Sequence, residues 1–189
     1  MTAPLKLPKK IFSCQSYHDM IAAGILDETE RLELLNGELI LMSPIGPKHS
    51  SIVKRINQLL QNLLNDRNTI VSIQDPITLE PASEPEPDIA LLKNRPDFYA
   101  NSHPTASDIY LIIEVADTTL EKDRQLKGNI YAKSGIPQYW IINLVDQQIE
   151  VYDTPIGEKY AHQQTYGIGE NITLPFFNIT IAVGQFFGF

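Results

Sequence analysis

The chain has 189 residues, 43% of them hydrophobic and 20% charged, which suits a globular domain with one sizeable core and argues against a disordered chain. Fifteen Lys and Arg against 23 Asp and Glu give a net charge of −8. That charge counts against indiscriminate nucleic-acid binding, although it leaves room for a local basic groove. The single cysteine, Cys14, excludes an intrachain disulfide framework and a cysteine-rich zinc site.

Membrane and secretory segments are absent from the sequence pattern. No run approaches the roughly 18 consecutive apolar residues of a membrane span. The N-terminal residues include three lysines but no apolar run and cleavage site of a secretory signal. We therefore expect a cytoplasmic protein without a membrane partner.

The N-terminal third is predicted to contain an arm, a short helix, a hairpin and a long helix. Residues 1–12 hold two prolines and several lysines and are expected to be an arm before a single domain over 13–189. Ser16 can cap a helix that runs to about Ala23. Asn36-Gly37 separates two apolar runs and predicts a hairpin, because both residues tolerate positive φ.

After a loop over 44–49, apolar residues recur at three- and four-residue spacing from Ser50 to Asn65. This pattern predicts an amphipathic helix that packs its apolar stripe on a core.

The rest of the chain reads as strands around one helix. Strands are predicted over 70–79 (broken by Pro76, so an edge or a bend), 88–92, 108–115, 138–144 and 146–153, with short strands beyond. Segment 108–115 is apolar on both faces and is typical of a central strand. Thr118-x-x-Glu121 is a capping box that opens a helix to about Ser134. The order predicts an α/β fold with a mixed β-sheet flanked by helices, an N-terminal β-hairpin and extra C-terminal strands.

Several common active-site motifs do not occur. The sequence has no dinucleotide-binding glycine loop, no phosphate loop, no H-E-x-x-H and no G-x-S-x-G. Its four histidines are scattered, which disfavours a polyhistidine metal site. Dinucleotide chemistry, zinc peptidase activity and nucleophile-elbow hydrolysis are therefore poorly supported.

Two carboxylates in apolar strands are the first candidate site residues. Glu114 lies within Leu111-Ile-Ile-Glu114-Val115, where a lone ionised carboxylate is costly to bury unless it is paired or metal-bound. Asp88 precedes another apolar strand. Carboxylates on neighbouring strand ends would form a hard-oxygen pair suited to Mg²⁺ or Mn²⁺. The alternative is that Glu114 faces solvent or a structural arginine.

A helical stripe follows these carboxylates. Asp123, Lys127 and Tyr131 are spaced i, i+4, i+8 and share one face of the predicted helix. A lysine beside a carboxylate pair can stabilise an oxyanion or orient a water. The alternatives are an exposed Asp–Lys pair and a tyrosine that serves only the core.

The order of these residues resembles the Uma2 family of the PD-(D/E)xK restriction-endonuclease-like superfamily. The matching strings are Glu86-Pro87-Asp88, Ile113-Glu114-Val115, Asp123-Arg-x-x-Lys127-x-x-x-Tyr131 and Gly135-Ile-Pro-x-Tyr139-Trp140. Asn36-Gly37-Glu38-Leu39 and Ser43-Pro44-x-x-x-x-His49 resemble the N-terminal signature of the same family. The resemblance spans about residues 15 to 185 and implies a restriction-endonuclease-like fold.

The resemblance also implies roles for individual residues. Asp88 and Glu114 correspond to metal-binding and catalytic carboxylates, with Mg²⁺ as the cofactor and Mn²⁺ as an alternative. The superfamily's usual lysine position is occupied by Ala116, and the family's lysine corresponds to Lys127 on the following helix. Lys122 competes for that role, although its helical face differs by about 140°.

Four further residues are expected to assist the site. Asp123 and Tyr131 share the stripe of Lys127, and the resemblance brings Glu38 and His49 toward the same centre. We expect Glu38 and His49 within about one bridging water of the carboxylate pair, as outer-sphere partners or substrate contacts. The alternatives are a solvent-facing Glu38 and a His49 that only assists helix capping.

These expectations lead to three hypotheses about function. The first is a Mg²⁺-dependent endonuclease that hydrolyses DNA, with lysines and arginines of the two long helices forming a local basic surface. The second is a non-cleaving interaction or regulatory protein that keeps the nuclease fold. The third is a small-molecule phosphodiesterase, which needs a closed pocket. Many superfamily nucleases cut duplexes as two-fold dimers, so a homodimer is expected.

Overall fold

The structure is a computed structural model that describes residues 8–27 and 29–188. Its centre is a six-stranded mixed sheet in the order β3-β4-β5-β6-β7-β8. The elements are α1 (Cys14–Ala22), β1 (Leu32–Leu35), β2 (Glu38–Leu41), α2 (Pro47–Leu64), β3 (Thr69–Ile73), β4 (Ile89–Lys93), the 3₁₀ turn η1 (Ala106–Asp108), β5 (Ile109–Ala116), the π-helix η2 (Lys122–Lys127), α3 (Gly128–Lys133), β6 (Gln138–Asn143), β7 (Gln148–Ile156), β8 (Lys159–Gly167), β9 (Asn171–Leu174), β10 (Ile179–Ala182) and α4 (Gly184–Phe187).

The sheet owes its mixed character to one crossover. Strands β5 and β6 pair in parallel, and η2 with α3 forms the connection between them, as a parallel pair requires. The other neighbouring pairs are antiparallel. The predicted α/β fold with a mixed sheet and flanking helices is thus confirmed. Strand β3 lies at an edge of the sheet, but it ends at Ile73, before Pro76, instead of continuing to residue 79.

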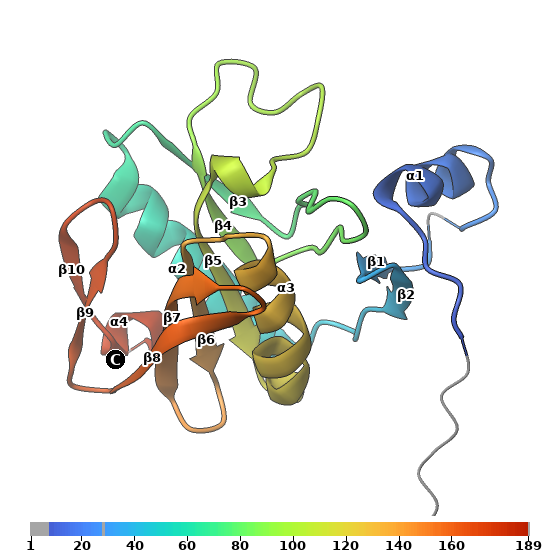
Figure 1. Ribbon diagram of the computed structural model, residues 1–189. Coiled ribbons are helices and arrows are strands. Elements are labelled where there is room, and N and C mark those ends of the chain that lie inside the picture. Colours follow the sequence, from blue (N-terminus) through green and yellow to red (C-terminus); the bar gives the residue numbers. More distant parts are fainter. Residues whose placement is uncertain (1–7, 28, 189) are drawn as a thin grey trace, which may run out of the picture.

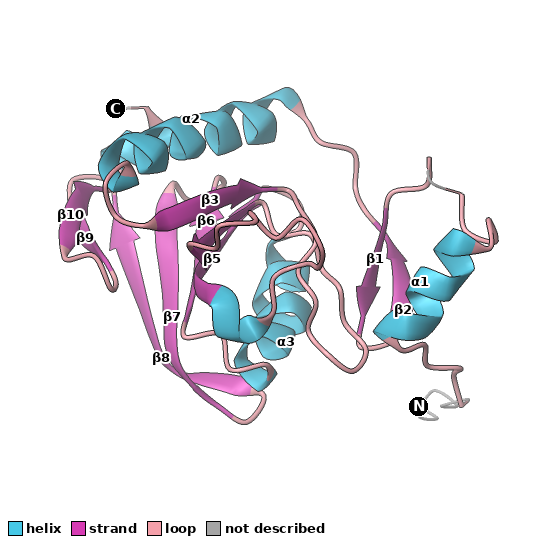
Figure 2. Ribbon diagram, turned by 90° about the horizontal axis from the view of Figure 1, so that it is seen from above, coloured by secondary structure: helices cyan, strands magenta, loops and turns pink. Residues whose placement is uncertain are grey.

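Apolar side chains form a core on each face of the sheet. Helix α2 crosses one face, where Ile56 and Leu60 are fully buried against Trp140 and Ile113 (Figure 2). Helix α3 covers the opposite face. Strand β5 contributes to both cores, which confirms that it is a central strand covered on both sides.

The N-terminal hairpin and α1 lie beside the main sheet (Figure 1). Asn36 and Gly37 have φ of 49° and 77°, as the predicted Asn-Gly turn requires. Backbone hydrogen bonds join this unit to the loop before β4, from Glu84 N to Leu34 O and from Gly37 N to Ala82 O. The hairpin is therefore fixed against the segment that delivers Asp88.

Several boundaries differ from the sequence expectations. Ser13, rather than Ser16, caps α1 and accepts the N–H of Ser16. Helix α2 begins at Pro47, so His49 lies in its first turn instead of before it. Proline suits that position because the first helical N–H needs no partner within the helix.

The helix after β5 does not begin at the capping box that the sequence predicted at Thr118. It starts at Leu120, after Thr119, whose hydroxyl donates to Asp123 Oδ2 at 2.6 Å. Its middle is a π-helix rather than regular α-helix, as the N–H of Gly128 reaching the carbonyl of Asp123 shows.

The C-terminal region contains more regular structure than the short strands expected there. Strand β8 has nine residues, β9 and β10 form a separate hairpin, and α4 follows. No helix in the described residues is both long and apolar enough to span a membrane. The division into an arm and a domain from residue 13 stays a prediction, and residues 1–7 of that arm lie outside the described residues.

Candidate active site

A cavity of about 370 Å³ opens where the hairpin, the N-terminus of α2, the start of β4 and the end of β5 meet η2. Its walls include most of the residues singled out from the sequence. The polar lining residues that matter below are Glu33, His49, Gln74, Glu86, Asp88, Glu114, Lys122, Asp123 and Lys127.

Strand pairing brings Asp88 and Glu114 together. Strands β4 and β5 are antiparallel with Ile89 opposite Ile113, so the residue before β4 lies beside Glu114. The backbone N–H of Asp88 donates to Glu114 Oε2 at 3.4 Å, and that of Val115 donates to Asp88 Oδ2 at 2.8 Å. Both acids are buried, with 8% and 3% of their surfaces exposed. The alternative of a solvent-facing Glu114 is therefore wrong.

His49 and Gln74 fix the Asp88 carboxylate. His49 Nε2 lies 3.0 Å from Asp88 Oδ2, and Gln74 Nε2 donates to Oδ1 at 3.1 Å. Burial raises the pKa of Asp88, but the hydrogen bonds and the charge of His49 outweigh burial and leave that pKa below its usual value. The same hydrogen bond raises the pKa of His49. His49 Nδ1 is buried and has no hydrogen-bond partner among the described residues.

Lys127 and Tyr131 both bind Glu114 from the helix that follows β5. Lys127 Nζ is 2.9 Å from Glu114 Oε1, and the Tyr131 hydroxyl donates to the same oxygen at 2.7 Å. Lys127 is 4% exposed, and Tyr131 is fully buried. Asp123, the third residue of the predicted stripe, also lines the cavity and is held by Thr119. The alternative of an exposed Asp123–Lys127 pair is therefore wrong, because both side chains are buried.

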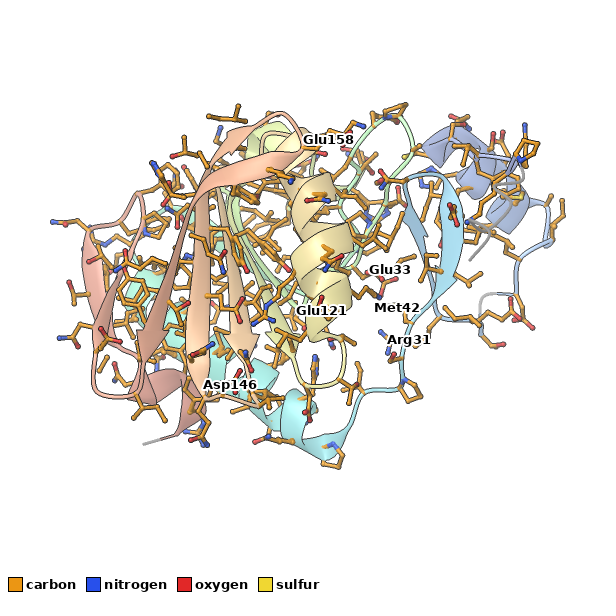
Figure 3. The ribbon with its side chains drawn as sticks, turned by 60° about the horizontal axis from the view of Figure 1, so that its bottom comes forward. Arg31, Glu33, Met42, Glu121, Asp146 and Glu158 are labelled. Atoms are coloured by element: carbon orange, nitrogen blue, oxygen red, sulfur yellow. The ribbon has the colours of Figure 1, made fainter. Side chains whose placement is uncertain are left out.

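Glu33 of β1 is a buried site residue that the sequence analysis missed. Its side chain is fully buried and projects toward the helix that follows β5, which contains η2 (Figure 3). Glu33 Oε1 lies 2.7 Å from Lys127 Nζ and accepts the backbone N–H of Glu86 at 3.0 Å. An acid between Leu32 and Leu34 carries the same signal that identified Glu114, a charge within an apolar strand.

The π-helix explains why two lysines reach Glu33. Lys122 Nζ is 3.1 Å from Glu33 Oε2, while Lys127 binds Oε1. In an α-helix residues five apart point about 140° away from each other, but the i→i+5 turn of η2 stacks them on one side. The expectation that Lys122 lies on a different face is therefore wrong.

The titratable groups of the cavity are strongly coupled. Burial, together with the charges of Asp88, Asp123 and Glu33, raises the pKa of Glu114 to about 8 despite the opposing effect of Lys127. Burial alone would lower the pKa of Lys127, but the surrounding carboxylates outweigh it, so Lys127 is an ammonium. Burial also raises the pKa of Asp123. For Glu33 the two lysines outweigh burial and lower the pKa.

Glu38 does not belong to this cluster, contrary to expectation. Its carboxylate binds Lys9 Nζ at 2.8 Å, is 40% exposed, and does not line the cavity. The strand register explains the difference, because Glu38 sits opposite Leu35 at the turn end of the hairpin, whereas Glu33 lies toward the other end. The expected position of His49 near Asp88 is found, and that of Glu38 is not.

Several cations of the basic surface predicted on the two helices contact other groups of the chain, whereas Lys54 and Arg55 are exposed. Arg124 binds the fully buried Glu150 through Nε at 2.9 Å and Nη2 at 2.5 Å. Lys133 pairs with Glu158 at 2.6 Å, and Lys48 donates to a backbone carbonyl. These cations are therefore already engaged within the chain.

Comparison with known proteins agrees with this fold. The Uma2 family model, described as "Putative restriction endonuclease", matches residues 14–184. A solved structure from Anabaena variabilis, titled as a putative nuclease belonging to DUF820, superposes with a TM-score of 0.72 at 18% identity, covering 94% of this chain and 98% of that one. No curated protein sequence matches. The neighbour confirms the nuclease-like fold, and the family match over nearly the whole length shows that this chain belongs to the Uma2 family.

Proposed function

We propose that this chain is a divalent-metal-dependent endonuclease that hydrolyses phosphodiester bonds in DNA, with Mg²⁺ as cofactor and Mn²⁺ as a substitute. One observation carries the proposal. Asp88, Glu114 and Lys127 converge in one cavity, with Lys127 Nζ 2.9 Å from Glu114 Oε1. Membership of a family described as "Putative restriction endonuclease" supports the same activity class.

The donor atoms fit a hard cation. Among residues 8–27 and 29–188, no three His, Cys, Asp or Glu side chains are spaced to enclose a metal ion. Mg²⁺ does not need such an enclosure, because proteins commonly hold it by one or two carboxylates while waters and substrate phosphates complete the shell. Asp88 and Glu114 would be those two carboxylates.

The side chains of the cavity would then have separate roles in the reaction. Bound Mg²⁺ would supply Lewis-acid polarisation of the phosphodiester and an acidified water. Lys127, which lines the cavity and is an ammonium, would stabilise negative charge that builds on the phosphate oxygens. His49 and Gln74 would keep Asp88 in place, and the partly exposed Lys122 would attract the DNA backbone.

Nicking of supercoiled plasmid tests the proposal. The wild-type protein should nick with Mg²⁺ or Mn²⁺ and be inactive with a chelator. Asp88→Asn and Glu114→Gln should abolish nicking, and Lys127→Met should slow turnover by a factor on the order of 100 to 1,000. The matched controls are Glu158→Gln and Lys133→Met, which alter an exposed ion pair of the same residue types.

Two results would argue against a nuclease. Metal-independent nicking, or equal rates in Glu114→Gln and Glu158→Gln, would remove the carboxylate pair from the mechanism. Metal binding without cleavage of any DNA would favour the alternative of a non-cleaving interaction protein, which the pairing of Arg124 with the buried Glu150 supports. Analytical ultracentrifugation tests the proposed homodimer.

A further inference from the structure

We infer that Glu33 is a positioning residue, which holds Lys127 so that its ammonium can leave Glu114 when a divalent cation binds there. The inference rests on the proposed function, because it assumes that Glu114 takes a cation. It adds a part of the N-terminal hairpin to a site whose other residues come from the main sheet and its helices.

Lys127 is shared between two carboxylates. Its Nζ lies 2.7 Å from Glu33 Oε1 and 2.9 Å from Glu114 Oε1, and the side chain is almost fully buried. Without a metal ion, the ammonium is therefore a direct hydrogen-bond partner of Glu114. A cation that binds either oxygen of the same carboxylate comes close to this ammonium, and two positive charges this close repel each other.

Glu33 offers the displaced ammonium a fixed partner. It accepts the backbone N–H of Glu86 at 3.0 Å and the ammonium of Lys122 at 3.1 Å, and it is fully buried. Because these contacts do not depend on Glu114, Glu33 stays in place when Glu114 turns toward a metal ion. Lys127 then keeps one charge-assisted hydrogen bond and remains at the cavity wall, where the substrate phosphate would lie.

Calorimetric titration with Mn²⁺ tests the inference without any measurement of cleavage. Glu33→Gln should weaken Mn²⁺ binding about tenfold or more, the scale of one charge-assisted hydrogen bond, because Lys127 then lacks a carboxylate partner to hold it away from Glu114. Lys127→Met should tighten binding by a similar factor. Glu33→Gln in the Lys127→Met background should change the affinity far less, because Glu33 acts through Lys127.

Controls separate this mechanism from a loss of structure or a general loss of charge. Lys133 and Glu158 form an exposed pair with the same chemistry, so Lys133→Met and Glu158→Gln should leave Mn²⁺ affinity unchanged. If Glu33→Gln does not fold, Glu33→Asp keeps the charge on a shorter side chain and should weaken binding by less.

The possible failures are distinguishable. If Glu33→Gln (or Glu33→Asp in its place) weakens Mn²⁺ binding equally with and without Lys127, or leaves the wild-type affinity unchanged, the inference is overturned and the proposed function stands. If the wild-type protein binds no Mn²⁺ at all, the proposed function fails and the inference fails with it.

Discussion

Replacement of Glu114 by glutamine should make the metal-free protein more stable at mildly alkaline pH. Burial raises the pKa of this carboxyl from 4.5 to about 8 in the folded protein. Between these two values the folded protein carries a proton at Glu114 that the unfolded chain has released. The free energy of unfolding therefore falls as the pH rises, by about 1.4 kcal/mol per pH unit from this group. Glutamine resembles the protonated acid in shape and charge and does not titrate.

The comparison is made by urea denaturation between pH 5 and 8 with a chelator present. Near pH 5 the wild-type protein and Glu114→Gln should be similarly stable, and near pH 8 the variant should be more stable by about 4 kcal/mol. Asp88 and Glu33 do not cause a similar fall in the free energy of unfolding over this pH range. Their pKa values are lowered, so the pH dependence that they contribute lies at more acidic pH. Glu158→Gln should follow the wild-type curve. Parallel curves for the wild-type protein and Glu114→Gln would refute the argument.

Three further predictions follow from contacts near the site. Arg124→Met should destabilise the protein by about 3 to 5 kcal/mol in urea denaturation, because it leaves the fully buried Glu150 without its cation. Tyr139→Phe should cost about 1 kcal/mol by the same measurement, because it removes the hydroxyl that donates to the Asp123 carbonyl in the π-helix. Lys122→Met should reduce the salt dependence of DNA binding measured by fluorescence anisotropy, while cleavage of bound DNA changes little.

Local sequence signals were sufficient for most of the fold. The Asn36-Gly37 turn, the apolar spacing after Ser50 and the apolar run around Glu114 predicted the hairpin, α2 and β5. The boundary errors have a common cause, since the residues of the first turn, rather than the apolar spacing, decide where a helix begins. Pro47 starts α2, for example, although the apolar spacing begins later.

The site itself was only partly predictable. Asp88 and Glu114 could be paired because apolar strands beside them predicted neighbours in one sheet. Glu33 could not be placed with them, because the contact of the hairpin with the helix joins segments about 90 residues apart. The π-helix that aligns Lys122 with Lys127 has no sequence signature comparable to a capping box.

The central claim is that Asp88 and Glu114 together hold a divalent cation beside Lys127. Anomalous scattering from a crystal soaked in Mn²⁺ tests it most directly. We expect a Mn²⁺ peak within bonding distance, about 2.1 Å, of one oxygen from each carboxylate, with Lys127 Nζ moved from Glu114 toward Glu33. A peak bound to other residues, or no peak in this cavity at saturating Mn²⁺, would contradict the claim.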